Sequence, residues 1–164
     1  MLSQASGYAS TALAYIALLP GPALVKDIAK ATDIPAPYLA KIVQVLAKKG
    51  FVKTQRGIGG GVSLALRAEE ITLFDICDAL DDPCTQTKCM MGNAKCSDER
   101  ACASHEFWKA QRAQCLGFLQ QTTIADLTKT KPILRFRVLQ TSEISRFAGI
   151  PGMDGVGSAR HTPA

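Results

Sequence analysis

Four cysteines and one histidine lie in a single polar stretch of the 164-residue chain, CTQTKCMMGNAKCSDERACASH. Their spacing is Cys84-x4-Cys89-x6-Cys96-x5-Cys102-x2-His105. Thiolate and imidazole groups bind zinc or iron–sulfur clusters, and a loop lets several of them reach one centre. Zinc sites usually take closely spaced ligand pairs, and only Cys102 and His105 are that close. The wider gaps favour an iron–sulfur cluster over zinc, because cluster ligands must reach different iron atoms.

Two further cysteines and a run of acidic residues are also candidates for chemistry. Cys77 and Cys115 fall on apolar helix faces, so we expect them to be small core residues. The acidic residues are Asp75, Asp78, Asp81 and Asp82. They could form an acid–base cluster, but a spacing of roughly one helical turn also describes an ordinary solvated face. We favour the solvated face.

Two other patterns resemble parts of enzymes. The i, i+3 placement of Cys102 and His105 could bring them together as nucleophile and base, but no third orienting group or oxyanion pocket accompanies them. The glycines between Arg56 and Val62 could form a phosphate-binding loop, but no Gly-Lys-Ser/Thr follows them. We therefore expect that the protein is not an enzyme.

The elements that precede the cysteine stretch must support it. Residues 5–19 and 24–31 are expected to form a longer and a shorter helix. Proline at position 37 suits a first helical turn, and the helix that follows has apolar side chains at i, i+3, i+4 and i+7. Gly50 ends this helix. Its other face presents outward the side chains of Tyr38, Ala40, Lys41 and Gln44.

A β-hairpin is expected next, because two β-prone runs, 51–55 and 62–66, flank the glycine-rich turn. Two helices, a turn, an amphipathic helix and a hairpin follow the order of a winged helix-turn-helix, with the hairpin as the wing. Residues 71–80 add one more helix. We therefore expect a mostly α fold with a winged helix-turn-helix DNA-binding domain over residues 1–82.

A loop, a helix and a tail are expected in the second half. Residues 83–105 show no apolar periodicity and form a cysteine-rich cluster loop. A long helix with Ser104 as its cap is expected to run to Leu127, within the segment 104–130. Its apolar stripe contains Phe107, Trp108, Cys115, Phe118 and Leu119. Such a helix needs a partner to cover it, so it is the expected dimerisation helix of a homodimer. Residues 131–164 read as a flexible C-terminal tail.

The net charge of +5 is unevenly distributed. Basic residues outnumber acidic ones in 1–70 and 106–164, and the reverse holds in 71–105. This pattern favours a polyanionic partner for the flanks. No apolar run approaches the roughly 20 residues of a membrane span, and no basic residue precedes the apolar stretch 9–19 as in a signal peptide. We expect a cytoplasmic protein without membrane contact, whose thiols stay reduced.

Three passages make the chain resemble a known family: PYLAKIVQVLAKKGFVKTQRGIGGGVSLA, then ITLFDICDAL, then CMMGNAKCSDERACASHEFW followed by FLQQTTIADL. From about residue 2 to residue 127 the chain is similar to the bacterial winged helix-turn-helix iron–sulfur regulators of the IscR and NsrR type. It most resembles the IscR type, which has three cysteines and then a histidine three residues after the last. The resemblance implies as cluster ligands Cys89, Cys96, Cys102 and His105.

Two departures from the family pattern affect the ligand set. The gap between Cys89 and Cys96 is longer than usual in the family, so Cys84 competes with Cys89 for the place of first ligand. The NsrR type completes its cluster with an aspartate from the N-terminal helix of the partner subunit, and the matching position here is Gly7, which cannot ligate. The resemblance therefore implies a 2Fe-2S cluster, with a 4Fe-4S cluster as the alternative.

The resemblance implies a DNA-binding transcriptional regulator, mainly a repressor, that senses redox state, nitric oxide or iron and cluster status. Two recognition helices of the homodimer would enter successive major grooves of a double-stranded DNA operator. The expected DNA contacts are Tyr38, Lys41, Gln44, Lys48, Lys49, Lys53 and, on the wing, Arg56. In the IscR type a glutamate occupies the place of Ala40, so we expect a different operator preference. The alternative is a zinc-bearing or cluster-free winged-helix regulator that acts by thiol redox chemistry or by protein–protein interaction.

Overall fold

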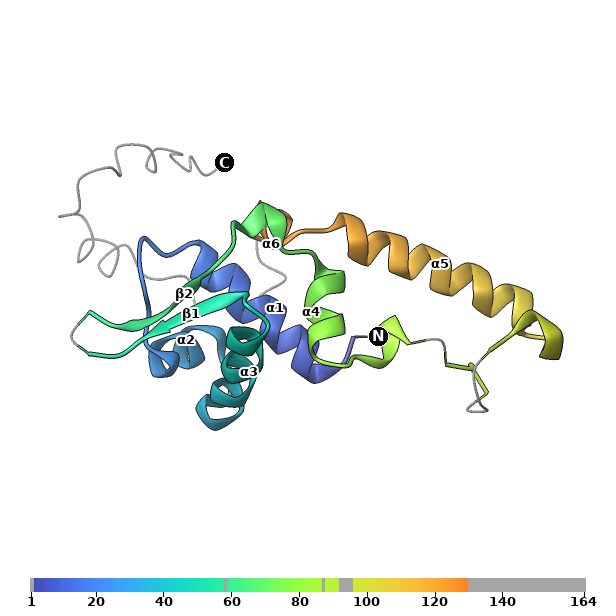
Figure 1. Ribbon diagram of the computed structural model, residues 1–164, viewed down its shortest axis with the longest axis horizontal. Coiled ribbons are helices and arrows are strands. Elements are labelled where there is room, and N and C mark those ends of the chain that lie inside the picture. The colour runs from blue at the N-terminus through green and yellow to red at the C-terminus, as the bar shows by residue number, and fades with distance from the viewer. Residues whose placement is uncertain (1, 58, 87, 92–95, 130–164) are drawn as a thin grey trace, which may run out of the picture.

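The computed structural model describes residues 2–57, 59–86, 88–91 and 96–129, and it shows a mostly helical protein from which one small antiparallel hairpin projects to the side (Figure 1). The expected tail, 131–164, lies outside the described residues. In chain order the elements are α1 (Gln4–Ala17), α2 (Val25–Thr32), α3 (Ala36–Lys48), β1 (Val52–Gln55), β2 (Gly61–Leu64), η1 (Ala68–Glu70), α4 (Leu73–Ala79), η2 (Pro83–Thr85), η3 (Asp98–Arg100), α5 (His105–Gln121) and α6 (Ile124–Lys129). This order confirms the mostly α winged helix-turn-helix fold.

Local backbone signals make the turn between α2 and α3. Asp33 ends α2 in the left-handed region at φ 56°, and the N–H of the buried Ile34 donates to the carbonyl of Ala29 over 3.0 Å. Pro35 precedes α3, and Pro37 lies in its first turn, where a missing N–H costs nothing. The apolar face of α3 packs inward as the periodicity predicts, through Leu39, Ile42, Val43 and Leu46.

The wing is anchored to the connection between α1 and α2. Strands β1 and β2 pair with Val52 opposite Leu64 and Gln55 opposite Gly61. Val62 also exchanges two backbone hydrogen bonds with Ala23, at 2.8 and 3.0 Å. A Cβ at Gly61 would lie 2.6 Å from the carbonyl oxygen of Ala23, so this close approach requires glycine.

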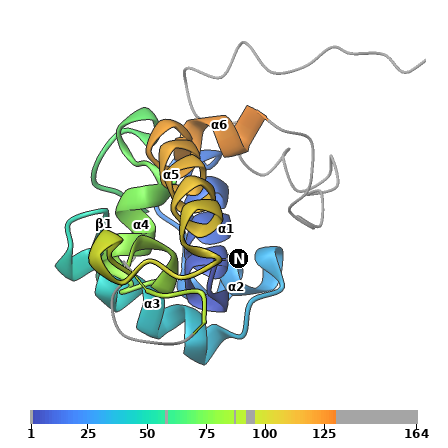
Figure 2. The same ribbon diagram turned by 90° about the vertical axis from the view of Figure 1, so that its right-hand side faces the viewer.

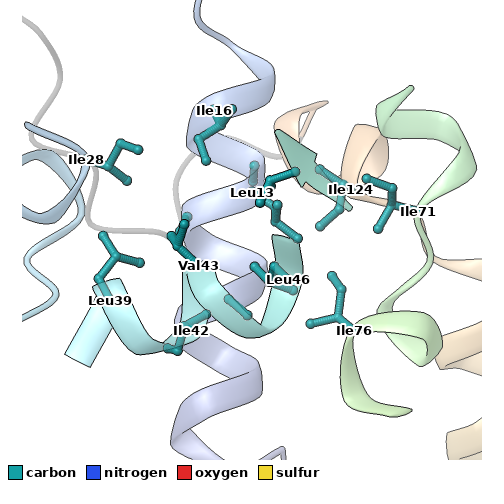
Figure 3. Packing of buried hydrophobic residues seen from close by; sticks show 14 of the residues in the cluster. Leu13, Ile16, Ile28, Leu39, Ile42, Val43, Leu46, Ile71, Ile76 and Ile124 are labelled. Atoms are coloured by element: carbon teal, nitrogen blue, oxygen red, sulfur yellow. The ribbon is translucent and has the colours of Figure 1, made fainter. Parts of the chain in front are cut away.

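The hydrophobic core surrounds α1, which passes through the middle of the buried cluster (Figure 3). Side chains from α1, α3, α4 and α6 meet there, and the fully buried members include Leu13, Leu46, Ile76 and Ile124. The connection before α6 closes the core, because Ile124 N–H donates to the carbonyl of Ile71 over 2.9 Å. The helix-turn-helix and the end of the α5–α6 segment therefore form one packed unit.

The expectation of one helix from Ser104 to Leu127 is wrong at its C-terminal part. Thr122 is extended, at φ −91° and ψ 120°, and separates α5 from α6. Thr123 then starts α6, because its N–H and hydroxyl both bond the Asp126 carboxylate, at 3.0 and 2.8 Å. Threonine side chains compete for such local hydrogen bonds and so favour helix ends over helix interiors. The break turns α6 back onto the core.

Helix α5 extends away from the helix-turn-helix and is seen end-on over α1 and α4 in Figure 2. Only His105 and Leu119 are buried among its residues. Phe107 and Phe118 are each 60% exposed. Cys115 is exposed too, so the prediction that it is a core residue is wrong for the single chain, whereas Cys77 is fully buried as predicted. No helix among the described residues has the length and apolar character to cross a membrane.

Candidate metal centre and nucleic-acid interface

The cysteine loop meets α5 at a buried histidine. His105 begins α5, and its backbone N–H donates to the carbonyl of Cys102 over 2.9 Å. Its ring is enclosed, with only 4% of the side chain exposed. Nδ1 lies 3.3 Å from the Sγ of Cys96, and Nε2 lies 2.8 Å from Oδ1 of Asp98. The ring therefore contacts a thiol at one nitrogen and a carboxylate at the other.

The Asp98 carboxylate holds the orientation of the His105 ring. Lys109 Nζ, 2.7 Å away, together with the bond to His105 lowers the pKa of Asp98, so the carboxylate is ionised near neutral pH. In the tautomer whose Nε2 proton bonds the carboxylate, the Nδ1 lone pair faces the Cys96 sulfur. Histidine ligands of metals are typically oriented by a carboxylate in this way. The sulfur and nitrogen donors are those of a mixed cysteine and histidine iron–sulfur site.

Of the four predicted ligands, the structure shows one pair in contact. Cys96 and His105 are in contact, whereas Cys89 is half-buried and Cys102 is exposed. Among the described residues, the groups of three ligand atoms within 4.8 Å of one another are Cys77, Asp82 and Cys84, and Asp98, His105 and Glu106. A binuclear cluster does not require all its ligands within the reach of one ion, and metal binding is commonly coupled to the folding of the segment that supplies the ligands. Cys89 and Cys102 remain predictions.

Cys84 faces a different part of the molecule. It lies in η2, where it packs against the hydrophobic core beside α4. Figure 1 shows this point near the N-terminus of the chain, while η3 lies beside the start of α5. Burial, hydrogen bonding to Asp82 and the nearby Cys77 thiol raise the pKa of the Cys84 thiol. Its position favours Cys89 over Cys84 as the first ligand of the loop centre.

The acidic run is not a solvated face throughout, contrary to expectation. Asp78 and Asp81 are exposed, and Asp75 caps α4 through Thr72. Asp82, in contrast, is 1% exposed. The local signal that could have identified it is the Asp-Pro step, since aspartate before proline commonly accepts backbone hydrogen bonds at the start of a turn.

Asp82 joins the N-terminus of the chain to the start of the loop. Its Oδ2 accepts the N–H of Ser3 at 2.8 Å, and its Oδ1 accepts the N–H of Cys84 at 2.9 Å. Burial acts to raise the pKa of this carboxyl, but the hydrogen bonds from Ser6, Cys84 and Ser3 outweigh it and hold the pKa well below its ordinary value. A buried carboxylate thus stays ionised between α1 and η2.

The predicted DNA contacts share one accessible region formed by α3 and the wing. All seven side chains are exposed: Tyr38, Lys41, Gln44, Lys48, Lys49, Lys53 and Arg56. Within the described ranges none of the five cations among them forms an ion pair with an acidic group, so each can meet a phosphate. Tyr38 stacks edge-on against Tyr8 of α1, with ring centroids 5.7 Å apart. This region lies at the opposite end of the molecule from the start of α5 (Figure 1).

Comparisons with known proteins agree with this architecture. A family model described as Rrf2, iron-dependent transcriptional regulator, matches residues 2–130. A protein of Aquifex aeolicus (strain VF5), named as a candidate HTH-type transcriptional regulator, is 38% identical over 123 residues, which cover 73% of this chain and 85% of the relative. The HTH-type transcriptional regulator IscR of Serratia proteamaculans (strain 568) is 31% identical over 149 residues, or 90% of each chain. The structure of CymR, the global cysteine regulator of B. subtilis, superposes with a TM-score of 0.66 at 27% identity, over 79% of this chain and 96% of that one.

Proposed function

Because this chain belongs to the Rrf2 family of transcriptional regulators, we propose that it binds operator DNA and senses redox state, nitric oxide or iron supply through an iron–sulfur cluster. The proposed ligands are Cys89, Cys96, Cys102 and His105, and a 2Fe-2S cluster suits this set. The observation that carries the proposal is the contact between Cys96 Sγ and His105 Nδ1, with Asp98 behind the ring. When bound, the cluster would supply a centre that oxidants and nitric oxide can alter.

DNA binding is proposed for α3 and the wing. Tyr38, Lys41 and Gln44 lie on the exposed face of α3, from which they would meet base edges and phosphates in a major groove. Arg56, on the tip side of β1, would enter the minor groove, where narrow A/T tracts attract guanidinium groups. Unpaired surface cations suit phosphate contacts, because they need not first break an ion pair.

A homodimer formed through α5 is proposed because this helix exposes apolar side chains that the described residues of the chain do not cover. Phe107 and Phe118 are each 60% exposed, and Met90 and Met91 of the loop are 52% and 67% exposed. Two-fold pairing of α5 helices would bury these groups and place the two α3 helices for successive half-sites.

A route from the loop to the recognition helix runs through α1. Asp82 bonds the N–H of Ser3 at the start of α1 and that of Cys84 at the start of the loop. Further along α1, Tyr8 stacks on Tyr38 of α3. A change in ligation that moves the loop would therefore alter the support of α3. Coupling energies between sites in regulators are typically about 1 to 3 kcal/mol, or roughly 5- to 150-fold in affinity.

The proposal is tested on anaerobically purified full-length protein. Iron and sulfide are counted per chain, and absorption and electron paramagnetic resonance spectra are recorded for the parent, Cys96→Ala, His105→Ala and the control Cys115→Ser. We expect a 2Fe-2S signature in the parent and the control, with loss or a changed spectrum in the two ligand variants. A parent that remains free of iron after reconstitution with iron and sulfide would overturn the cluster.

Operator affinity then tests the sensing step. DNA selected with the parent protein is titrated with the cluster-containing and the cluster-free form at the same salt concentration. We expect at least a 5-fold difference in affinity between the two forms. Equal affinities would separate DNA binding from sensing and favour a second candidate, a cluster-free regulator. The likeness to CymR, whose name is that of a cysteine regulator, supports this second candidate.

A further inference from the structure

A second group of metal-binding side chains lies outside the loop centre. The Sγ atoms of Cys77 and Cys84 and a carboxylate oxygen of Asp82 all lie within 4.8 Å of one another. Cys77 lies on α4, Asp82 immediately before η2 and Cys84 in η2, and the Ser6 side chain of α1 acts to lower the pKa values of both Asp82 and the Cys77 thiol. None of these three side chains is needed for the proposed cluster.

The group is enclosed and carries a negative charge without a cation partner. Cys77 is 0% exposed, Asp82 is 1% exposed and Cys84 is half-buried. Asp82 is ionised, and within the described residues no lysine, arginine or histidine forms an ion pair with it. Hydrogen bonds alone can stabilise a buried carboxylate, so the charge of Asp82 does not by itself indicate a metal. The two adjacent sulfur atoms do, because thiolates are the preferred ligands of thiophilic cations.

We propose that Cys77, Asp82 and Cys84 bind a divalent thiophilic cation, zinc in the first instance, at the junction of α1, α4 and η2. Tetrahedral zinc with Zn–S bonds of about 2.3 Å separates its thiolate sulfurs by about 3.8 Å. The two sulfurs lie within 4.8 Å of each other, so they are no more than about 1 Å farther apart than that separation. The Ser6 hydroxyl or a water molecule would occupy the fourth position.

Charge balance selects a divalent ion over a monovalent one. With both thiols protonated and Asp82 ionised, the site carries one negative charge. Zinc(II) replaces two thiol protons, so the net charge of the buried site is unchanged. Copper(I) with the same two thiolates would leave one additional negative charge in an enclosed place, which burial disfavours.

A bound ion would hold the start of the cysteine loop against the body of the protein. Asp82 already connects Ser3 to Cys84, and a metal would add bonds from α4 to η2. The proposed site is therefore structural, and it would exist whether or not the loop carries a cluster.

The test separates this site from the loop. Full-length protein with the three substitutions Cys89→Ala, Cys96→Ala and Cys102→Ala is titrated with zinc against a chromophoric chelator, and with cobalt(II). We expect one zinc per chain and a thiolate-to-cobalt charge-transfer band in the near ultraviolet. Adding Cys84→Ala should weaken zinc binding at least 100-fold, while adding Cys115→Ser should leave it unchanged.

Two results would overturn the site: a triple variant that binds no zinc or cobalt, or binding that survives Cys84→Ala. Circular dichroism confirms that each variant is folded. The cobalt band is first recorded on the triple variant, in which Cys77 and Cys84 are intact. That spectrum tests the site even if the added Cys84→Ala substitution prevents folding. The cluster has its own readout, iron per chain in the parent, so either proposal can fail alone.

Discussion

Replacing Asp82 should destabilise the protein strongly although the residue lies at the edge of a loop. The carboxylate is 1% exposed and accepts two backbone N–H groups that lie 79 and 2 residues away in sequence. In Asp82→Ala, both N–H groups lose their acceptor, and the first turn of α1 is released from η2. Asp78→Ala, on the exposed side of α4, is the matched control.

The magnitude follows from the two hydrogen bonds. A hydrogen bond to a charged group contributes about 1.5 to 3 kcal/mol, and the lower end applies because Ser3 and Cys84 are only partly buried. We therefore expect Asp82→Ala to lower the free energy of unfolding by about 3 kcal/mol. Asp78→Ala should change it by less than about 0.5 kcal/mol, as is usual for surface positions.

Acid should reduce the same contribution. A carboxyl whose pKa is lowered on folding stabilises the fold above its ordinary pKa, which is 3.8 for Asp82, and loses this effect as the pH falls through the folded value. Between pH 5 and about pH 3 the parent should thus lose more stability than Asp82→Ala. Urea unfolding followed by circular dichroism, with a chelator present to keep the protein free of metal, measures both effects. If Asp82→Ala and Asp78→Ala unfold alike, or if the two pH profiles are parallel, the reasoning is wrong.

Three further predictions concern other parts of the molecule. Lys41→Ala should reduce the slope of log affinity against log salt by about 1 in operator titrations, and Lys129→Ala on α6 should not change it; equal slopes for both would remove the α3 phosphate contact. Gly60→Ala should lower the free energy of unfolding, measured with urea, by about 1 to 3 kcal/mol, because the new Cβ would collide with a backbone carbonyl of β1. At Gly7 a Cβ would meet open space, so Gly7→Ala should raise the free energy of unfolding by about 0.5 to 1 kcal/mol. Asp98→Asn should speed iron loss to a chelator roughly 10- to 100-fold, since a neutral amide oxygen holds the Nε2 proton of the proposed ligand His105 more weakly than a carboxylate does. An unchanged rate would contradict that role.

Part of the site could be predicted because its signal is local. His105 follows Ser104, the predicted helix cap, so its place at the start of α5 could be predicted from the sequence. The pairing of His105 with Cys96 and Asp98 is harder to foresee, since it depends on how the loop folds back. The sequence does not indicate the second group, because its members belong to different patterns. Cys77 falls on an apolar helix face, Asp82 in an acidic run and Cys84 in the cysteine loop.

The sequence by itself determined the helix-turn-helix, the wing and the exposed face of α3. Those features depend on apolar periodicity, proline and glycine positions and β-propensity, which act over a few neighbouring residues. Tertiary structure decided that Asp82 is buried and that Cys115 is exposed, because burial depends on which distant segment packs against a residue. The Asp-Pro step and the Thr123–Asp126 pair are local signals for a turn and a helix start, but they do not say whether the segment that follows packs on the core. Burial is a property of the assembled chain, because it is measured against neighbours that the sequence places far away.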